Sequence, residues 1–344
     1  MPTDWTPFPK VELHRHLEGS LRLDTLAEIA RQQGFPEEDR DPRLLAPRVS
    51  VVEGEPADPG TFLSKFSQLR RFFVSAEVAR RAAREAVEDA ARDGVAYLEL
   101  RFNPVAWSVN SGLSLGEAAD RVIEGVEEGA AATGLLTRLI VSVNRVELDT
   151  GAQLLDLAAE RRDRGVAGLD LTGDEAHGPA EPFEKLFERA RDRELGITVH
   201  AGEWAGPENV RFALEKLGAR RIGHGIRVMD DPEALKLARE HDASFEVCIS
   251  SNVQTGAVAG LEEHPLGRMM EAGLNVTLNT DDPEVSGITL SGEWALAEAR
   301  FGLGLEDFRR LTLRAAGRAF LPVPERAGLL DRLEEGFRGR LANS

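Results

Sequence analysis

The chain has 344 residues, of which 42% are hydrophobic and 29% charged, a composition typical of a globular protein with a large buried core. Its formal net charge of −17 would repel phosphate backbones, so we expect no nucleic-acid partner. The single cysteine, Cys248, excludes an internal disulfide and a CxxC metal site. Residues 1–10 lack a signal-peptide pattern and no apolar run could span a bilayer, so we expect a cytoplasmic protein without membrane partners.

Short β-branched or apolar runs alternate with longer amphipathic segments along the chain. The runs typical of strands are Val11–His14, Ala96–Phe102, Leu139–Val143, Val166–Leu171, Ile197–His200, Arg221–Gly223, Ser244–Cys248 and Asn275–Asn279. The segments typical of helices are Ser75–Arg92, Leu115–Thr133, Gly151–Arg164, Phe183–Glu194, Glu208–Leu217, Asp231–His241 and Leu266–Ala272. Eight strands joined by helical crossovers indicate parallel pairing. We therefore expect an α/β fold, a (β/α)₈ TIM barrel, in one domain over residues 1–344.

Two segments fall outside this alternation. Residues Pro36–Gly60 are rich in Pro, Asp, Glu and Gly, and Phe62–Phe73 carries apolar residues at helical spacing. We therefore expect a helical insertion after the first strand. This insertion could pack on the barrel wall or close over the barrel mouth, and the sequence leaves both open. After Thr289 the chain becomes mostly helical and ends in a charged tail.

Four of the seven histidines lie at or just beyond the carboxyl ends of predicted strands: His14, His16, His200 and His224. In an α/β barrel, active sites are built at that end of the strands. The other three, His177, His241 and His264, fall in loops or at a helix end, so we expect them to be solvated or locally hydrogen-bonded.

The histidines at strand ends have the spacing of metal ligands. His14 and His16 are alternate residues, so their rings project to the same side. His200 would supply a third nitrogen, and Asp281, in the segment Asn279–Pro283 after the last strand, a carboxylate. Three neutral imidazoles and one carboxylate favour zinc with room for a water molecule, although other divalent cations accept the same ligands.

Two further residues would complete a hydrolytic site. Glu203 follows His200 by one short turn, so its carboxyl group can face the metal without binding it and act as an acid. His224 lies between two glycines, where the ring can approach a metal-activated water, orient it and take its proton. Gly173, in the loop after the fourth strand, would allow the backbone to approach a flat ligand closely.

Together these segments resemble the adenosine deaminase family of the amidohydrolase superfamily. The matching motifs run in the family's order over most of the chain: His14–Gly19, Asp170–Glu175, His200–Glu203, Ile222–Gly225 and Asn279–Pro283. The segment Ser250–Gly256 is also similar to the one that follows the seventh strand in bacterial members.

The resemblance implies a barrel of the metal-dependent hydrolase type and a site for a purine nucleoside. One Zn²⁺ per chain would be bound by His14, His16, His200 and Asp281, with His16 also contacting the substrate. Glu203 would protonate N1 of the purine, and His224 would position and deprotonate the water that attacks C6. Asp282 would hold the N7 edge, the backbone of Gly173 the N3 edge, and Glu18 would face the 5′ end of the sugar. Adenosine or 2′-deoxyadenosine would give inosine or 2′-deoxyinosine, and ammonia.

One departure leaves the substrate open. Adenosine-specific members often have Asp where this chain has Glu18, so adenine deaminase and aminodeoxyfutalosine deaminase remain alternatives. A two-metal amidohydrolase usually needs a lysine from the fourth strand, and Val166–Thr172 has none. A barrel that had lost catalysis would have a broken ligand set, whereas every expected ligand is present here. The sequence does not indicate the oligomeric state.

Overall fold

The computed structural model describes residues 3–341, with side chains to residue 339. Eight parallel strands form one sheet in chain order from β1 to β8. The strands are β1 (Lys10–His16), β2 (Val95–Phe102), β3 (Leu136–Asn144), β4 (Val166–Thr172), β5 (Gly196–Ala201), β6 (Arg221–His224), β7 (Ser244–Val247) and β8 (Asn275–Leu278). Each predicted strand is present, with ends shifted by three residues or fewer, so the predicted TIM barrel is confirmed.

The barrel closes between its last and first strands through a single residue. Asp281 N donates to His14 O at 3.0 Å, and His16 N donates to Asp281 O at 2.8 Å, which makes an isolated parallel bridge to Arg15. β1 therefore continues to His16, two residues beyond its predicted end at His14. The closure places a residue of the β8 loop directly beside both histidines of β1.

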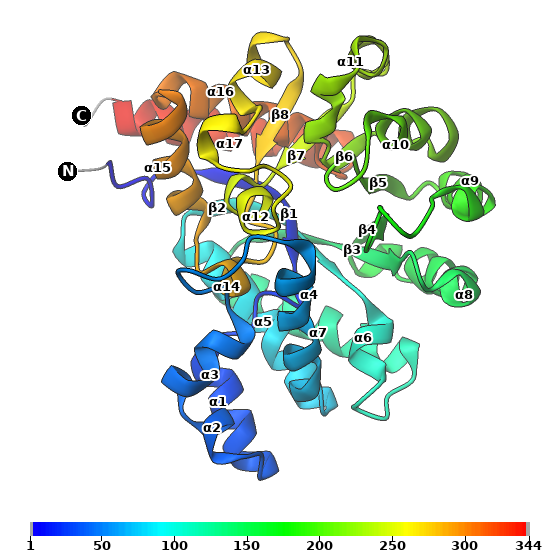
Figure 1. The fold of residues 1–344 in the computed structure, drawn as a ribbon, viewed down its shortest axis with the longest axis vertical. Coiled ribbons are helices and arrows are strands. Elements are labelled where there is room, and N and C mark those ends of the chain that lie inside the picture. The colour runs from blue at the N-terminus through cyan, green and yellow to red at the C-terminus, as the bar shows by residue number, and fades with distance from the viewer. Residues whose placement is uncertain (1–2, 342–344) are drawn as a thin grey trace.

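Helices cover the outside of the barrel (Figure 1). The crossovers are α5 (Ala76–Arg92), α7 (Leu115–Thr133), α8 (Leu148–Glu160), α9 (Glu184–Asp192), α10 (Pro207–Phe212), α11 (Pro232–Glu240) and α13 (Leu266–Glu271). The chain ends in α15 (Leu290–Phe301), α16 (Leu305–Arg318) and α17 (Val323–Leu341). The predicted helix at Glu208–Leu217 is divided, because a π-helical turn over Ala213–Leu217 follows α10. Three short helices after strands were not predicted: α6 (Pro104–Ser108), α12 (Ile249–Gln254) and α14 (Pro283–Ser286).

The predicted insertion after β1 is mainly helical, with an irregular stretch over residues 50–58. It comprises α1 (Leu23–Gln33), α2 (Glu37–Arg40), α3 (Pro42–Val49), α4 (Pro59–Leu69) and a 3-10 turn over Arg70–Phe72. In Figure 1, α1 to α3 project from the barrel and α4 lies in front of the barrel. The helices α2 and α3 fall within the Pro-rich segment, where no helix was predicted; Asp41 caps α3 by accepting from Arg43 N. The insertion shares one hydrophobic core with the barrel, since Leu26, Leu45 and Phe62 belong to the same buried cluster as the strands.

The barrel interior contains paired charges where most such barrels have apolar layers. Arg101 contacts Asp170 at 3.1 Å and Glu246 at 2.6 Å, and Arg221 contacts Glu99 at 2.5 Å, with all five side chains buried. Ion pairs taken out of water persist only when each charge is compensated. This buried network supports the residues at the carboxyl end of the strands. Within residues 3–341, no helix combines the length and apolar character needed to cross a membrane.

Candidate active site

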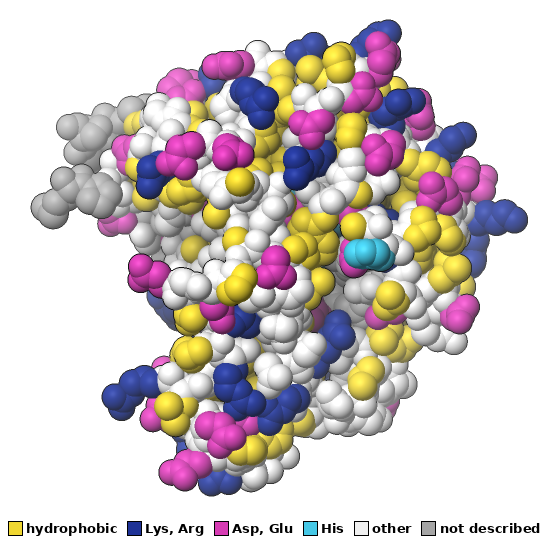
Figure 2. Space-filling view, viewed as in Figure 1, with side chains coloured by type: hydrophobic (Ala, Val, Ile, Leu, Met, Phe, Trp, Pro, Cys, Tyr) yellow, Lys and Arg dark blue, Asp and Glu magenta, His cyan; other side chains and the backbone are white. Residues whose placement is uncertain are grey.

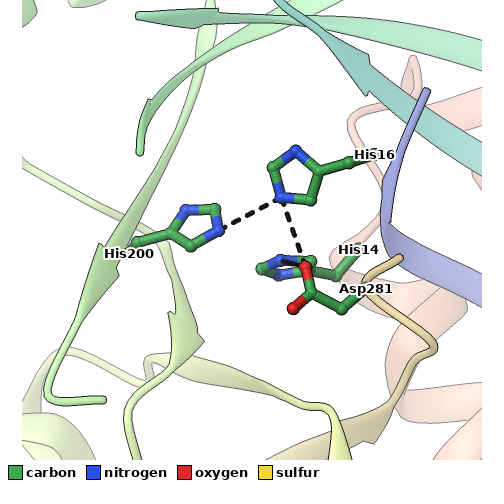
Figure 3. A group of neighbouring side chains, drawn as sticks. All are labelled: His14, His16, His200 and Asp281. Atoms are coloured by element: carbon green, nitrogen blue, oxygen red, sulfur yellow. Dashed lines mark hydrogen bonds and ion pairs between the residues drawn. The ribbon is translucent and has the colours of Figure 1, made fainter. Parts of the chain in front are cut away.

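The four predicted metal ligands converge at the carboxyl end of the barrel (Figure 3). His14 and His16 come from β1, His200 from β5 and Asp281 from the loop after β8. Their ligand atoms all lie within 4.8 Å of one another. His16 Nε2 is 3.2 Å from His200 Nε2, and Asp281 Oδ1 is 3.1 Å from His14 Nε2. This spacing is that of atoms arranged around one ion.

Buried carboxylates determine which ring nitrogen of two ligands faces the centre. His14 Nδ1 donates to Glu246 at 3.0 Å, and His200 Nδ1 lies 3.2 Å from Asp170. Burial acts to raise the pKa of Glu246, but Arg101 and Arg221 hold that pKa well below its usual value, so Glu246 accepts as a carboxylate. With protons on Nδ1, both rings direct an Nε2 lone pair to the centre, as in metal sites supported by outer carboxylates. His14 Nε2 is buried and makes no hydrogen bond, which fits a ligand atom.

A second group of possible ligands comprises His224, Cys248 and Asp281. This group shares Asp281 with the first and replaces two imidazoles by a thiol. Burial, together with the charge of Asp281, raises the pKa of Cys248 well above its usual value. The group with three histidines offers four ligand atoms, whereas this group offers three, so the group with three histidines is the more complete metal site.

The backbone at two of these residues adopts an uncommon conformation. Asp281 has φ 66° and His224 has φ 57°, both in the left-handed region that non-glycine residues rarely enter. Such conformations persist at functional sites because the surrounding contacts hold them. Gly223 has a different role, since a Cβ there would lie 2.9 Å from His14 Cε1. Only glycine lets the β6 backbone approach the metal ligands so closely.

Glu203 lies in a turn organised by Glu175. Glu175 follows β4, and its carboxylate accepts from the backbone nitrogens of four consecutive residues, 202–205, at 2.5–3.0 Å. Glu203 Oε2 is 3.5 Å from His224 Nε2. Burial, with the charges of Asp281 and Glu175, raises the pKa of Glu203 well above its usual value. These surroundings favour the protonated form of the Glu203 carboxyl group.

A cavity of about 350 Å³ lies at this end of the barrel, a size suited to a small organic ligand. Its lining includes His16, His200, Glu203, His224 and Asp281. Asp282 borders the cavity, and its buried Oδ1 has no hydrogen-bond partner. Glycine at position 19 leaves the space that this oxygen occupies, because a Cβ there would lie 2.0 Å from Asp282 Oδ1. Gly173 also borders the cavity with φ 103°, so its backbone faces the space directly. A larger hollow, of about 1100 Å³, lies around the starts of β4 and β5 and contains none of the histidines, so we do not assign the reaction there.

Glu18 lies at one side of the cavity, and two hydrogen bonds fix the position of its carboxyl group. Its Oε1 accepts from Asn103 N, at the N-cap of α6, at 2.9 Å and from Trp107 Nε1, within α6, at 2.8 Å. Burial raises the pKa of Glu18 to about 7 despite these donors. Glu18 also belongs to the lining of the cavity, so a ligand there can contact its side chain.

The insertion forms the outer wall of the same cavity. Phe62, Leu63, Phe66 and Arg70 line it together with His16 and Glu203. Leu63 is 38% exposed, so this side chain of the insertion is open to the cavity. Of the two alternatives for Phe62–Phe73, the structure therefore places this segment at the barrel mouth. Figure 2 views this end of the molecule, where apolar side chains border a hollow near the centre.

All residues predicted for the site lie together, but several contributors were not predicted. Glu246 and Arg101 lie in strands and Asn252 lies in the unpredicted α12. The sequence did contain an indication for Glu246 and Arg101. Each is a charged residue within a mostly apolar parallel strand, and a buried charge must be paired. His177 is exposed beside Asp174 and His241 is exposed at the end of α11, as expected. His264 is buried and locally hydrogen-bonded.

Comparison with known proteins matches this geometry. The family model for adenosine deaminase matches residues 9–336. The chain is 39% identical to an adenosine deaminase of Klebsiella pneumoniae (strain 342) over 331 residues, or 96% of this chain and 98% of that protein. Two solved structures are also similar. One is an adenine deaminase from Arthrobacter aurescens, with 26% identity, a TM-score of 0.85, and coverage of 97% of this chain and 99% of that one.

The other structure is a cog1816 amidohydrolase with bound Zn from Burkhoderia ambifaria. It has 27% identity and a TM-score of 0.86, and the match covers 99% of this chain and 94% of that one. Because the family match extends over most of the chain, and the 39% identical relative is covered almost completely, this chain belongs to the adenosine deaminase family.

Proposed function

We propose that this protein hydrolyses adenosine and 2′-deoxyadenosine to the corresponding inosines and ammonia, with one Zn²⁺ per chain. The observation that carries this proposal is that three of the four candidate ligands, together with Glu203 and Asp282, border one cavity of about 350 Å³. The fourth candidate ligand, His14, lies directly beside the other three. The name of the 39% identical relative supports the substrate, and the bound Zn of the amidohydrolase neighbour supports the metal. The buried Nε2 of His14, free of hydrogen bonds, supports the ligand set.

Within this proposal, His14, His16, His200 and Asp281 hold the metal. Three imidazoles and a carboxylate suit Zn²⁺ and leave room for a water molecule. When bound, the metal would make that water acidic enough to act as a nucleophile at neutral pH. Glu246 and Asp170 hold His14 and His200 in the tautomer that ligation needs.

The remaining side chains bind and activate the purine. Glu203, whose pKa burial raises, donates a proton to N1, which makes C6 electrophilic. Asp282 Oδ1, unpartnered in its buried position, holds the N7 edge, and the backbone of Gly173 holds the N3 edge. Glu18 Oε2 faces the sugar. Uncompensated polar atoms of this kind favour a ligand that hydrogen-bonds to each of them.

The water adds its oxygen to C6 and the C6–N bond breaks. The proton that the water releases passes to Asp281 Oδ2, while His224 Nε2, which lies 3.9 Å from that oxygen, holds the water in place. From there the proton reaches the departing amine, which leaves as ammonia. The second proton of the water leaves the C6 oxygen as the C=O bond forms and returns to Glu203, which replaces the proton that Glu203 gave to N1. The net change is one water consumed, one ammonia released and a 6-oxo purine formed.

We also propose that residues 1–344 act as one catalytic domain in the cytoplasm. The core shared by the insertion and the barrel supports a single domain. Residues 1–2 and 342–344 of that expected domain lie outside the described residues. One buried cysteine without a disulfide partner fits a cytoplasmic location.

The test is ammonia release by zinc-loaded protein offered adenosine, adenine and aminodeoxyfutalosine side by side. We expect the highest kcat/KM for adenosine. A clear preference for adenine, the substrate in the name of the Arthrobacter neighbour, would move the assignment to the free base. A preference for aminodeoxyfutalosine would mean that Glu18 contacts a substituent on the 5′ carbon that is larger than the hydroxyl group of adenosine. If none of the three compounds reacts, the proposed function is wrong.

A further inference from the structure

A chain of hydrogen bonds reaches the proton-transfer residues from outside the site. It begins at a backbone N–H, which can only donate: Leu266 N donates to His264 Nδ1 at 3.2 Å. Because burial lowers the pKa of His264 to about 4, this ring is neutral at neutral pH and carries one proton. With Nδ1 accepting, that proton is on Nε2, which lies 3.3 Å from Asn252 Oδ1.

The next link is the amide of Asn252, in α12. Its oxygen accepts from His264, so its NH₂ group must face the other way. Asn252 Nδ2 lies 3.1 Å from Glu203 Oε1 and 3.1 Å from His224 Nδ1. An amide rotated by 180° would place NH₂ against the His264 N–H and an oxygen against the Glu203 carboxyl group. The orientation of the amide is therefore determined by the backbone of Leu266.

The same amide determines where protons reside on its two partners. His224 Nδ1 accepts from Asn252, so the neutral ring has its proton on Nε2, the atom that faces Asp281. Glu203 Oε1 accepts from Asn252 at 3.1 Å and lies 3.4 Å from Thr255 Oγ1. A proton on Glu203 therefore resides on Oε2.

We propose that His264 and Asn252 are positioning residues that hold His224 as the Nε2–H tautomer and place the acid proton of Glu203 on Oε2. The catalytic consequence of this positioning rests on the proposed deamination. His224 then holds the attacking water by donating from Nε2 to its oxygen. The metal ligands His14 and His200 have the opposite tautomer, with protons on Nδ1. Two classes of neutral histidine thus lie within one site, and each class is set by a different group of buried partners.

The direct test is ¹⁵N NMR of zinc-loaded protein labelled at histidine, with signals assigned from single His→Gln variants. Pyridine-type and pyrrole-type nitrogens have well-separated shifts. We expect His224 and His264 each to have a pyridine-type Nδ1 and a pyrrole-type Nε2. A pyrrole-type Nδ1 on His224 in the wild-type protein would overturn the proposal, whatever the enzyme's activity.

Variants connect the tautomer to turnover. In Asn252→Asp the donor becomes an acceptor, so His224 should shift its proton to Nδ1 and kcat should fall by about 100-fold, as for loss of other positioned proton-transfer partners. His264→Leu removes the donor that orients the amide, and kcat should fall about tenfold with KM nearly unchanged. His264→Gln keeps a donor and should restore most of kcat. His241→Gln, at an exposed histidine on α11, is the matched control.

Zinc content and thermal unfolding separate this role from a merely structural one. We expect one zinc per chain in each variant, because neither residue is a ligand. If His264→Leu leaves both the His224 spectrum and kcat unchanged, the proposal is wrong. If the wild-type protein deaminates nothing but shows the expected tautomers, the proposed function fails while the positioning of His224 stands.

Discussion

Replacement of Glu203 by glutamine tests the acid role without enlarging or shrinking the side chain. The amide can keep accepting from Asn252 and Thr255 through its oxygen, while an NH₂ group replaces Oε2. What is lost is the proton for N1 of the purine. General acid catalysis contributes about 10²–10⁴-fold, or about 3–5 kcal/mol of barrier, so kcat should fall by that factor. The fold should tolerate the change, because burial already favours the neutral form of this carboxyl group.

The assay is ammonia release under saturating adenosine, with zinc measured in the same samples by elemental analysis. Glu203 is outside the ligand cluster, so zinc should remain at one per chain. Glu208→Gln, at an exposed carboxylate in the first turn of α10, is the matched control and should retain full activity. Activity of Glu203→Gln within tenfold of wild type would refute the acid role. Loss of zinc together with activity would show that Glu203 helps to hold the metal.

Three further changes test other parts of the site. His16→Ala should lower zinc content and the thermal midpoint, and full zinc occupancy would contradict its assignment as a ligand. Glu175→Gln weakens the acceptor for four backbone N–H groups and should cost about 1–3 kcal/mol in urea unfolding as well as activity. Phe66→Ala shortens the wall contributed by the insertion, so KM for adenosine should rise several-fold with kcat nearly constant; an unchanged KM would mean that α4 does not contact the substrate.

The sequence predicted the fold well because the signals were local. Short β-branched or apolar runs marked all eight strands, and Leu115–Thr133 was predicted with its observed ends. That helix has a complete capping box at Ser114 and a left-handed Gly134 at its end, so both ends are encoded nearby. The short helices α6, α12 and α14 have four to six residues, too few to show a helical period.

Strand-end histidines also indicated the candidate ligands, because parallel strands place their carboxyl ends at one edge. The support beneath those ligands could not be predicted in the same way. Asp170 and Glu246 interrupt apolar strands, which indicates that each needs a buried partner. Their common partner, Arg101, comes from β2, which neighbours neither β4 nor β7 in the sheet. That contact crosses the barrel interior, so it depends on barrel closure and strand register rather than on any sequence spacing.

The proton positions depend on contacts of longer range still. Two histidines of similar burial, His14 and His224, carry their protons on different ring nitrogens because one donates to Glu246 and the other accepts from Asn252. Nothing in the residues adjacent to either histidine encodes this difference. It follows from a carboxylate kept ionised by Arg101 in one case and from an amide oriented by His264 in the other. The proposed ligand role of His14 and the proposed water-orienting role of His224 therefore originate in the buried partners of the two rings, and exchange of those partners should exchange the tautomers.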